Sequence, residues 1–188
     1  IPEDYELRSA AKGISFGIIY GSGPTGLAST MRSQVNEARE MIERWSTRYP
    51  KAFSLRHDME KLAASSENFL PMADGGTIYL GKKVELPKCA NYPVQRAALA
   101  IMARAIIRHH ATLDREARAG RQLGTRMAAT IHDALIDEAK NRDADDALRL
   151  MKQDMIDGYL DIFPGAPIDK LVEGGAGKDW GNLEDQEV

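Results

Sequence analysis

The sequence is poor in cysteine and lacks long hydrophobic runs, and each absence excludes a class of protein. Cys89 is the one cysteine among 188 residues, so the chain can form neither an internal disulfide nor a zinc site built on several cysteines. No apolar run is long enough to cross a membrane, and no signal peptide is recognisable. These features predict a soluble globular protein of a reducing, cytoplasmic compartment, without a membrane partner.

The net charge of −3 is unevenly distributed along the chain. Residues 96–132 carry seven arginines against two acids, whereas residues 133–188 carry fifteen acids against six basic side chains. Basic clusters supply the sequence-independent part of nucleic-acid binding. A solubilising surface explains the arginines equally well, so both interpretations stay open at this point.

The spacing of apolar residues and helix breakers predicts an α+β protein. Helices are expected over 3–21, 28–49 (as one helix or two), 52–64, 93–118 and 143–160. Asp143 is expected to cap the last of these with its side chain. Short strands are expected on either side of residues 74–76 within a hairpin at 69–80, and over 126–131, 134–138 and 168–172, before a loop-like tail.

A stripe of four residues is the first candidate binding feature. Arg8, Lys12, Phe16 and Tyr20 recur every four residues within the first predicted helix. Residues four apart lie on one helix face, so two cations are expected to lead into two aromatic rings. A triphosphate, a sugar and a base would match that order of chemistry. For the cations alone, a solvated helix face is the commoner explanation.

The second candidate is the pair His132-Asp133, which falls between two predicted strands at a tight turn. A carboxylate held there suits Mg²⁺, which proteins bind through one or two carboxylates together with substrate phosphates. His132 could touch a phosphate or a chain terminus. His-Asp is also ordinary turn composition, and one carboxylate is too few for a two-metal site.

Taken in order, four segments resemble the polymerase core of family A DNA polymerases. The pattern Arg8-x3-Lys12-x3-Phe16-x3-Tyr20 resembles motif B of that family, and residues 130–138 resemble its motif C. Residues 91–95, Asn-Tyr-Pro-Val-Gln, resemble its Asn-x-Pro-x-Gln segment, and residues 177–180 its C-terminal ending. The resemblance implies a fragment of a right-hand polymerase fold. Residues 1–90 would form a helical fingers subdomain, and residues 91–188 an antiparallel-sheet portion of the palm.

The resemblance also implies a role for each residue of the stripe. Arg8 and Lys12 would hold the phosphates of an incoming dNTP, and Lys12 would thereby take part in catalysis. Phe16 would pack on the sugar, and Tyr20 would lie near the templating base. The reaction implied is attack of a primer 3′-hydroxyl on the α-phosphate, in a bacterial or phage-infected cell.

The resemblance further implies contacts to primer-template DNA and to metal. Asn91, Gln95, Arg96 and His132 would contact DNA, and Asp133 would be one of the carboxylates that bind two Mg²⁺ ions. The other set of ligands would lie outside this chain.

Three departures from the family pattern shape the expectation. Ala134 stands where an acid usually follows the His-Asp pair, and Arg96 stands where a small residue is usual. The stretch between the predicted hairpin and Asn91 is short, which is more typical of a phage-type or divergent member. Motif A, with the other metal-binding Asp, should precede Ile1. We therefore expect a fragment, a processed product or half of a split protein, inactive without an N-terminal segment carrying motif A and the thumb.

Three alternatives remain at the level of sequence. The first is a non-catalytic nucleic-acid-binding module that retains the polymerase fold. The second is a metal-dependent hydrolase using His132 and Asp133, which is disfavoured because the other histidines are scattered or lie on predicted helices. The third is an RNA polymerase of the same family.

Overall fold

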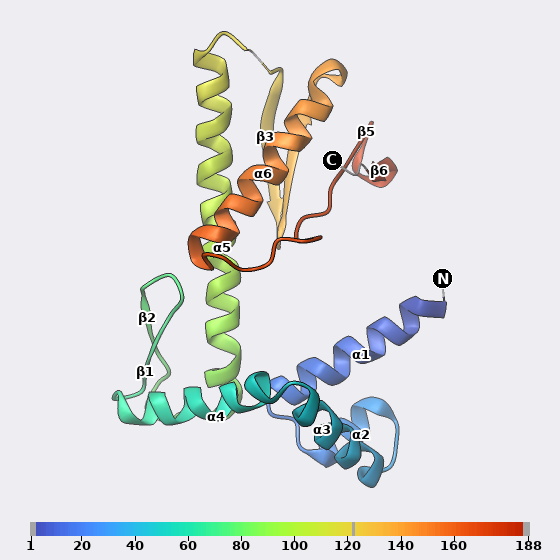
Figure 1. The fold of residues 1–188 in the computed structure, drawn as a ribbon, viewed down its shortest axis with the longest axis vertical. Coiled ribbons are helices and arrows are strands. Elements are labelled where there is room, and N and C mark those ends of the chain that lie inside the picture. Colours follow the sequence, from blue (N-terminus) through green and yellow to red (C-terminus); the bar gives the residue numbers. More distant parts are fainter. Residues whose placement is uncertain (1–2, 122, 186–188) are drawn as a thin grey trace. The chain divides into compact units, whose positions relative to one another are not determined.

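The computed structural model describes residues 3–121 and 123–185, and it divides the chain into two compact units, Ile1–Gln95 and Arg96–Val188 (Figure 1). Helices predominate in both units, and the strands form small antiparallel pairs. The expected α+β class is confirmed. Within the described residues no helix is both long and apolar enough to cross a membrane.

Four helices open the first unit: α1 (Glu3–Ile19), α2 (Pro24–Met31), α3 (Val35–Arg48) and α4 (Pro50–Ser65). A proline begins both α2 and α4, where its missing N–H has no intrahelical partner to lose. The stretch 28–49 is two helices because Arg32 adopts a left-handed conformation, with φ 53°, and closes α2. The backbone N–H of Gln34 then donates to the Glu37 carboxylate at 3.3 Å, which satisfies one free donor at the start of α3.

Two apolar clusters stabilise the first unit. One lies among α1 to α4 and is centred on the buried residues Ile18, Leu27, Ala28 and Ala38. The other lies beneath the hairpin of β1 (Phe69–Pro71) and β2 (Thr77–Tyr79) and contains Ala63, Leu70, Met72, Leu80 and Cys89. Each large apolar side chain buried in this way contributes about 1.5–3 kcal/mol relative to exposure.

The β1–β2 hairpin forms where the sequence predicts it. The carboxylate of Asp74 accepts a hydrogen bond from the N–H of Gly76 at 3.1 Å, and Gly75 takes a φ of 83° that favours glycine. Leu70 and Ile78 pair across the strands, and Leu70 is fully buried. The turn thus fixes a register that places Leu70 in the core.

The long helix α5 (Leu86–Arg118) ends at the predicted residue but begins seven residues before Pro93, so the predicted start is wrong. Pro93 lies inside α5, although proline cannot donate the hydrogen bond that a helix interior requires. Cys89 and Ala90 are both buried on the first turns of α5, Cys89 within the cluster beneath the hairpin. This burial offsets the missing bond, which the local sequence could not reveal.

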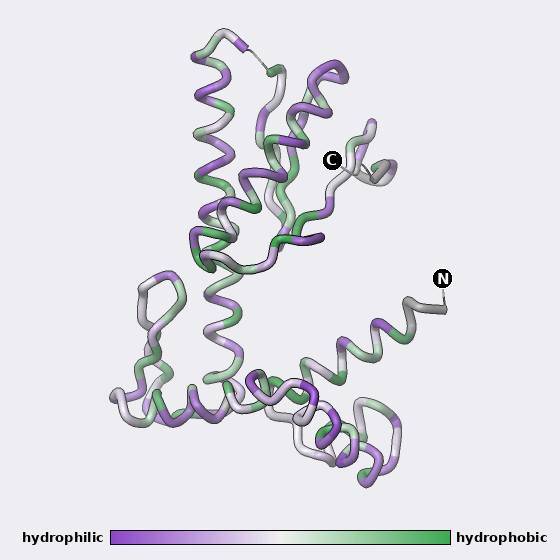
Figure 2. The backbone as a smooth tube through the Cα atoms, in the orientation of Figure 1, coloured by the Kyte–Doolittle hydropathy of each residue, from purple (hydrophilic) through white to green (hydrophobic). Residues whose placement is uncertain are grey.

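The second unit is built around the hairpin of β3 (Thr125–Ile131) and β4 (Ala134–Ala139). The helix α6 (Ala144–Ile162) follows a single 3₁₀ turn, η1 (Asn141–Asp143). The hairpin lies alongside the part of α5 in this unit and alongside α6 (Figure 1). Hydrophobic and hydrophilic residues alternate along both helices, as expected for helices with one face in a core (Figure 2).

Three predictions for the second unit are wrong. Asp143 does not cap α6 with its side chain; its carboxylate accepts instead from the N–H of Gly124 at 3.1 Å. Residues 168–172 form turns and irregular backbone rather than a strand. The strands lie in the tail that was expected to be loop-like, as β5 (Gly175–Gly177) and β6 (Leu183–Asp185), with the 3₁₀ turn η2 (Trp180–Asn182) between them.

We predict that Gly158→Ala destabilises the second unit by about 1–3 kcal/mol, because overpacking forces neighbouring atoms apart. A Cβ at Gly158 on α6 would lie 2.7 Å from the backbone N of Ala105 on α5. The measurement is the free energy of unfolding in urea. Gly13→Ala is the matched control: nothing lies within 4 Å of its added Cβ, so it should stabilise α1 by about 0.5–1 kcal/mol. Equal effects of the two substitutions would contradict the close approach of the helices.

Candidate functional site

The stripe, called the α1 stripe here, forms as a row in which Arg8, Lys12 and Phe16 lie on α1 and the half-buried Tyr20 lies in the turn directly after it. The Nζ atom of Lys12 lies 5.7 Å from the ring centroid of Phe16, within cation–π range. The rings of Phe16 and Tyr20 stack, with centroids 5.9 Å apart and planes 21° from parallel. Arg8 and Lys12 are exposed, and Phe16 is 45% exposed. A cation and two aromatic faces are therefore continuous along one side of the helix.

The opposite side of α1 holds the stripe in place. Ile18 is fully buried in the cluster among α1 to α4, and Ile14 packs against it. The indole N–H of Trp45 on α3 donates to the Ser15 hydroxyl at 3.2 Å. α1 is therefore an amphipathic helix whose exposed face carries charged and aromatic groups that its own unit leaves uncovered.

His132 and Asp133 form the two-residue turn between β3 and β4, as the sequence predicts. Ile131 pairs with Ala134 directly across the turn. His132 has a φ of 53°, in the left-handed region that two-residue hairpin turns require at their first position. Both side chains are exposed. The turn therefore presents an imidazole and a carboxylate at the end of a rigid hairpin.

The three candidate DNA contacts on α5 have different surroundings. The Oδ1 atom of Asn91 is buried and has no hydrogen-bond partner among the described residues. Gln95 and Arg96 are exposed. A buried carbonyl oxygen without a donor is costly, so Asn91 is the one of the three whose placement suggests an outside partner.

The residues present do not complete a metal site. At the β3–β4 turn Asp133 is followed by Ala134, and in the parts of the chain that the structure describes no three His, Cys, Asp or Glu side chains are grouped to hold a metal ion. The Asp133 carboxylate has the right chemistry for Mg²⁺, but proteins bind this ion through carboxylates together with substrate phosphates, and the turn supplies one carboxylate alone. The fit of Mg²⁺ to this chain alone is therefore incomplete.

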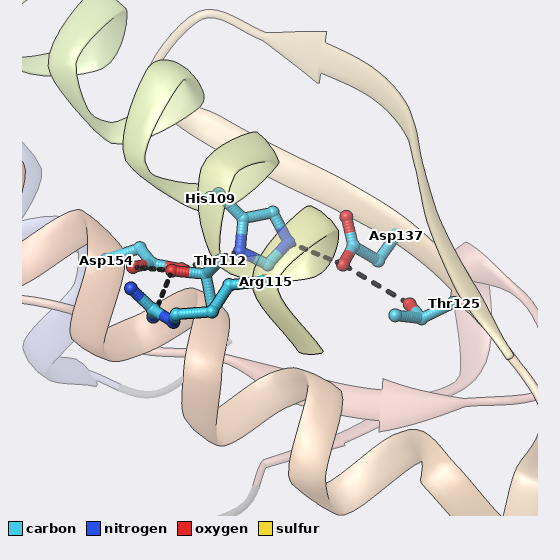
Figure 3. Close-up of polar contacts among 6 residues, drawn as sticks. All are labelled: His109, Thr112, Arg115, Thr125, Asp137 and Asp154. Carbon is cyan, nitrogen blue, oxygen red and sulfur yellow. Dashed lines mark hydrogen bonds and ion pairs between the residues drawn. The ribbon is translucent and has the colours of Figure 1, made fainter. Parts of the chain in front are cut away.

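A buried polar cluster, the His109 bridge, consists of His109 on α5, Asp137 on β4 and Asp154 on α6 (Figure 3). The ring atom Nε2 of His109 lies 2.8 Å from Asp137 Oδ2, and Nδ1 lies 2.9 Å from Asp154 Oδ2. Burial lowers the pKa of His109, but hydrogen bonds from its ring to the two carboxylates, and their charges, raise it to about 9. The bridge therefore holds a cation between two anions.

The sequence reasoning missed the His109 bridge. Among the apolar residues of the long helix, Val94 is 46% exposed whereas Ala105 is fully buried. The buried face continues from Ala105 to His109 and Thr112, at spacings of four and three. The sequence signal for the bridge was that His109 and Thr112, both polar, continue the buried face of the helix. Their partners lie 28 to 45 residues further along the chain.

The basic stretch 96–132 is partly neutralised by acidic residues. Arg108 makes two hydrogen bonds to the Asp161 carboxylate, of 2.6 and 2.7 Å, and these raise the pKa of Arg108 and lower that of Asp161. Arg126 pairs with Glu138 at 2.7 Å, and Arg121 with Glu116 at 2.6 Å. At these positions the arginines pair with carboxylates of the second unit rather than forming an unpaired basic surface.

Comparison with known proteins places the chain among polymerases. The sequence profile of DNA polymerase family A matches residues 3–182. The chain is 27% identical to DNA polymerase I of Pseudomonas aeruginosa over 187 residues, which cover 93% of this chain and 19% of that protein. It is 30% identical to the thermostable DNA polymerase I of Thermus thermophilus over 185 residues, which cover 93% of this chain and 20% of that protein. The chain spans about a fifth of the length of these relatives.

The fold points the same way. The POL domain of Pol1 from M. smegmatis, in complex with DNA primer-template and dNTP, superposes with a TM-score of 0.72. The match covers 82% of this chain and 28% of that chain, at 23% sequence identity. The profile match spans nearly all of the sequence, including both the α1 stripe and the β3–β4 turn. This chain belongs to DNA polymerase family A.

Proposed function

We propose that this chain forms the nucleotide-holding fingers and the C-terminal part of the palm of a template-directed DNA polymerase. The observation that carries the proposal is the α1 stripe: Lys12, Phe16 and Tyr20 lie side by side along α1 and the turn after it, and the other side of this helix is buried. Membership of family A and the dNTP bound by the M. smegmatis relative support this interpretation.

Each residue of the α1 stripe has a part in holding a dNTP. Arg8 and Lys12 would donate charge-assisted hydrogen bonds to the phosphates, which are stronger than bonds between neutral groups. Phe16 would pack against the sugar with its exposed ring, and Tyr20 would lie beside the base pair being formed. Because the buried side fixes α1, these groups are oriented before the nucleotide arrives, which reduces the entropic cost of binding.

The β3–β4 turn is proposed to face the primer end. Asp133 would be one ligand of Mg²⁺, which when bound stabilises charge on the reacting phosphate. His132 would contact the primer strand, and Asn91, Gln95 and Arg96 would contact DNA near it. Because this chain supplies one carboxylate at the turn, the active form would contain further carboxylates from other polymerase segments of the kind that carry motif A and the thumb.

A non-catalytic nucleic-acid-binding module is the second candidate. Ala134 beside Asp133 favours it, because the acid usual after the His-Asp pair is missing. The polymerase and the binding module differ in their dependence on the α1 stripe, because a module that only binds nucleic acid does not need to bind a nucleotide triphosphate.

We predict that Lys12→Gln raises the KM for dNTP by about 10- to 100-fold, since losing a charged hydrogen bond costs about 1.5–3 kcal/mol. The measurement is steady-state primer extension by this chain supplied with the remaining family A segments. Lys51→Gln is the control, because Lys51 is an exposed cation on α4 outside the stripe. Unchanged KM in Lys12→Gln, or binding of DNA without template-directed incorporation in the unsubstituted protein, would refute the proposed function.

A further inference from the structure

We propose that His109 is a positioning residue: by bridging Asp137 and Asp154 it ties the β3–β4 hairpin to α5 and α6 and so fixes the turn that carries Asp133. The link to Asp133 rests on the proposed function, whereas the bridge itself does not. His109 would not touch substrate; it would act through the strand β4.

All three side chains of the His109 bridge are shielded from solvent. His109 is fully buried, and the side chains of Asp137 and Asp154 are 4% and 10% exposed. Asp137 Oδ2 also accepts from the Thr125 hydroxyl at 3.4 Å, while Oδ1 is buried without a hydrogen-bond partner among the described residues (Figure 3). His109 is therefore the short, charged contact of the Asp137 carboxylate.

The Asp154 carboxylate has a second hydrogen-bond partner on α5 besides His109. The Thr112 hydroxyl donates to Asp154 Oδ1 at 2.9 Å, and Arg115 donates to the Thr112 oxygen at 3.1 Å. Arg108 is the other cation near this end, and the charge of Asp154 contributes to raising its pKa. Both oxygens of Asp154 thus have partners on α5, so His109 is bonded to an anchored carboxylate.

The bridge needs a proton on each ring nitrogen of His109. A neutral imidazole carries a single N–H, so with Asp137 and Asp154 ionised it can donate to one carboxylate and must turn a lone pair toward the other. A protonated imidazolium donates to both. The charged groups that face the ring are therefore Asp137 from β4 and Asp154 from α6, with Arg108 and Arg115 of α5 further out.

The hairpin is held at β4 rather than at the turn. On β4, Leu135 is 8% exposed and the side chain of Asp137 is 4% exposed. Ile131, His132 and Asp133 at the end of the hairpin are exposed. Strands rise about 3.3 Å per residue, so Asp137 lies about 13 Å along the chain from Asp133. The bridge supplies directional hydrogen bonds between the hairpin and the helices, whereas the burial of Leu135 is non-directional.

The test compares two substitutions at Asp137 in the assembled polymerase. Asp137→Ala removes the contact, and kcat should fall by about 10- to 100-fold while the KM for dNTP stays within about two-fold, because misplacement of a reacting group by about 1 Å has costs of this size. Asp137→Asn should restore kcat, because an amide N–H can donate to the neutral ring at Nε2 while Nδ1–H still donates to Asp154.

The pH profile separates positioning from mere stability. The ratio of wild-type kcat to that of Asp137→Asn should fall as the pH passes about 9, where His109 loses its second proton. Glu138→Gln is the matched control on the same strand: it removes the exposed pair with Arg126 and should leave the wild-type profile unchanged.

A second measurement needs no polymerase activity and no variant. In the ¹⁵N-labelled chain, the backbone amide signals of Asp133 and Ala134 should shift with the same midpoint as the ring nitrogens of His109. Amide chemical shifts at the turn that stay constant while His109 titrates would overturn the proposal. So would an Asp137→Asn profile identical to that of the wild type. If the wild type incorporates no nucleotide but its turn amides shift together with His109, the proposed function is rejected and the role of the bridge is retained.

Discussion

Replacing Asp133 by Asn is expected to reduce nucleotide incorporation by on the order of 10³-fold while leaving DNA affinity within a few-fold. An amide keeps the size of the carboxylate but loses the charge that a metal ligand supplies. Asp133 is exposed, and no hydrogen bond or ion pair of its side chain is found in the described part of the chain. The substitution should therefore change the free energy of unfolding by less than about 0.5 kcal/mol.

The measurement is single-turnover primer extension by the assembled polymerase, with primer-template affinity determined separately. Asp169→Asn is the matched control, because it neutralises another exposed aspartate of the same unit outside the candidate site. Full incorporation by Asp133→Asn would reject the assignment of Asp133 as a metal ligand. Loss of both DNA binding and incorporation in Asp133→Asn would show instead that Asp133 supports the binding of DNA.

The second large effect concerns the pH dependence of folding. The folded pKa of His109 is raised from 6.5 to about 9, so its contribution is fully present below about pH 6.5 and is lost as the pH rises through about 9. At 1.36 kcal/mol per pKa unit the contribution is about 3 kcal/mol. We therefore expect the free energy of unfolding to fall by about that amount across this interval.

Urea unfolding of the chain at a series of pH values checks this expectation. In His109→Gln the decline between pH 6.5 and 9 should disappear, and the variant should be less stable at neutral pH because two buried carboxylates lose the cation that they share. His110→Gln is the control, because this neighbouring histidine is 73% exposed and 3.7 Å from Asp114. The same decline in His109→Gln as in the wild type would show that other groups cause it.

The parts of the fold that could be predicted from sequence are those that depend on neighbouring residues. The hairpin turn at Asp74 forms through a bond to Gly76, two residues away. The turn at His132 follows from two strand-forming segments that are separated by two residues. The α1 stripe required only the helical period. In each case the chemistry that fixes the conformation lies within about four residues.

The features that escaped prediction depend on distant residues. The first turns of α5 are helical because Cys89 is buried in a cluster with Leu70 and Leu80. Asp143 does not cap α6 because the N–H of Gly124, 19 residues earlier, takes its carboxylate. The His109 bridge joins residues up to 45 positions apart. Local propensity contains no information about such partners, so tertiary packing decided these cases.

The pairing of the basic stretch with acidic side chains has a consequence for the ionic-strength dependence of DNA binding. Each phosphate neutralised by a protein cation releases condensed counterions, and the slope of log K against log[salt] counts these contacts. Three of the seven arginines in residues 96–132 already lie within 2.7 Å of a carboxylate: Arg108, Arg121 and Arg126. An arginine in such a pair must give up its carboxylate before it can displace a counterion. The affinity of this chain for DNA should therefore weaken less steeply with added salt than its arginine content alone suggests.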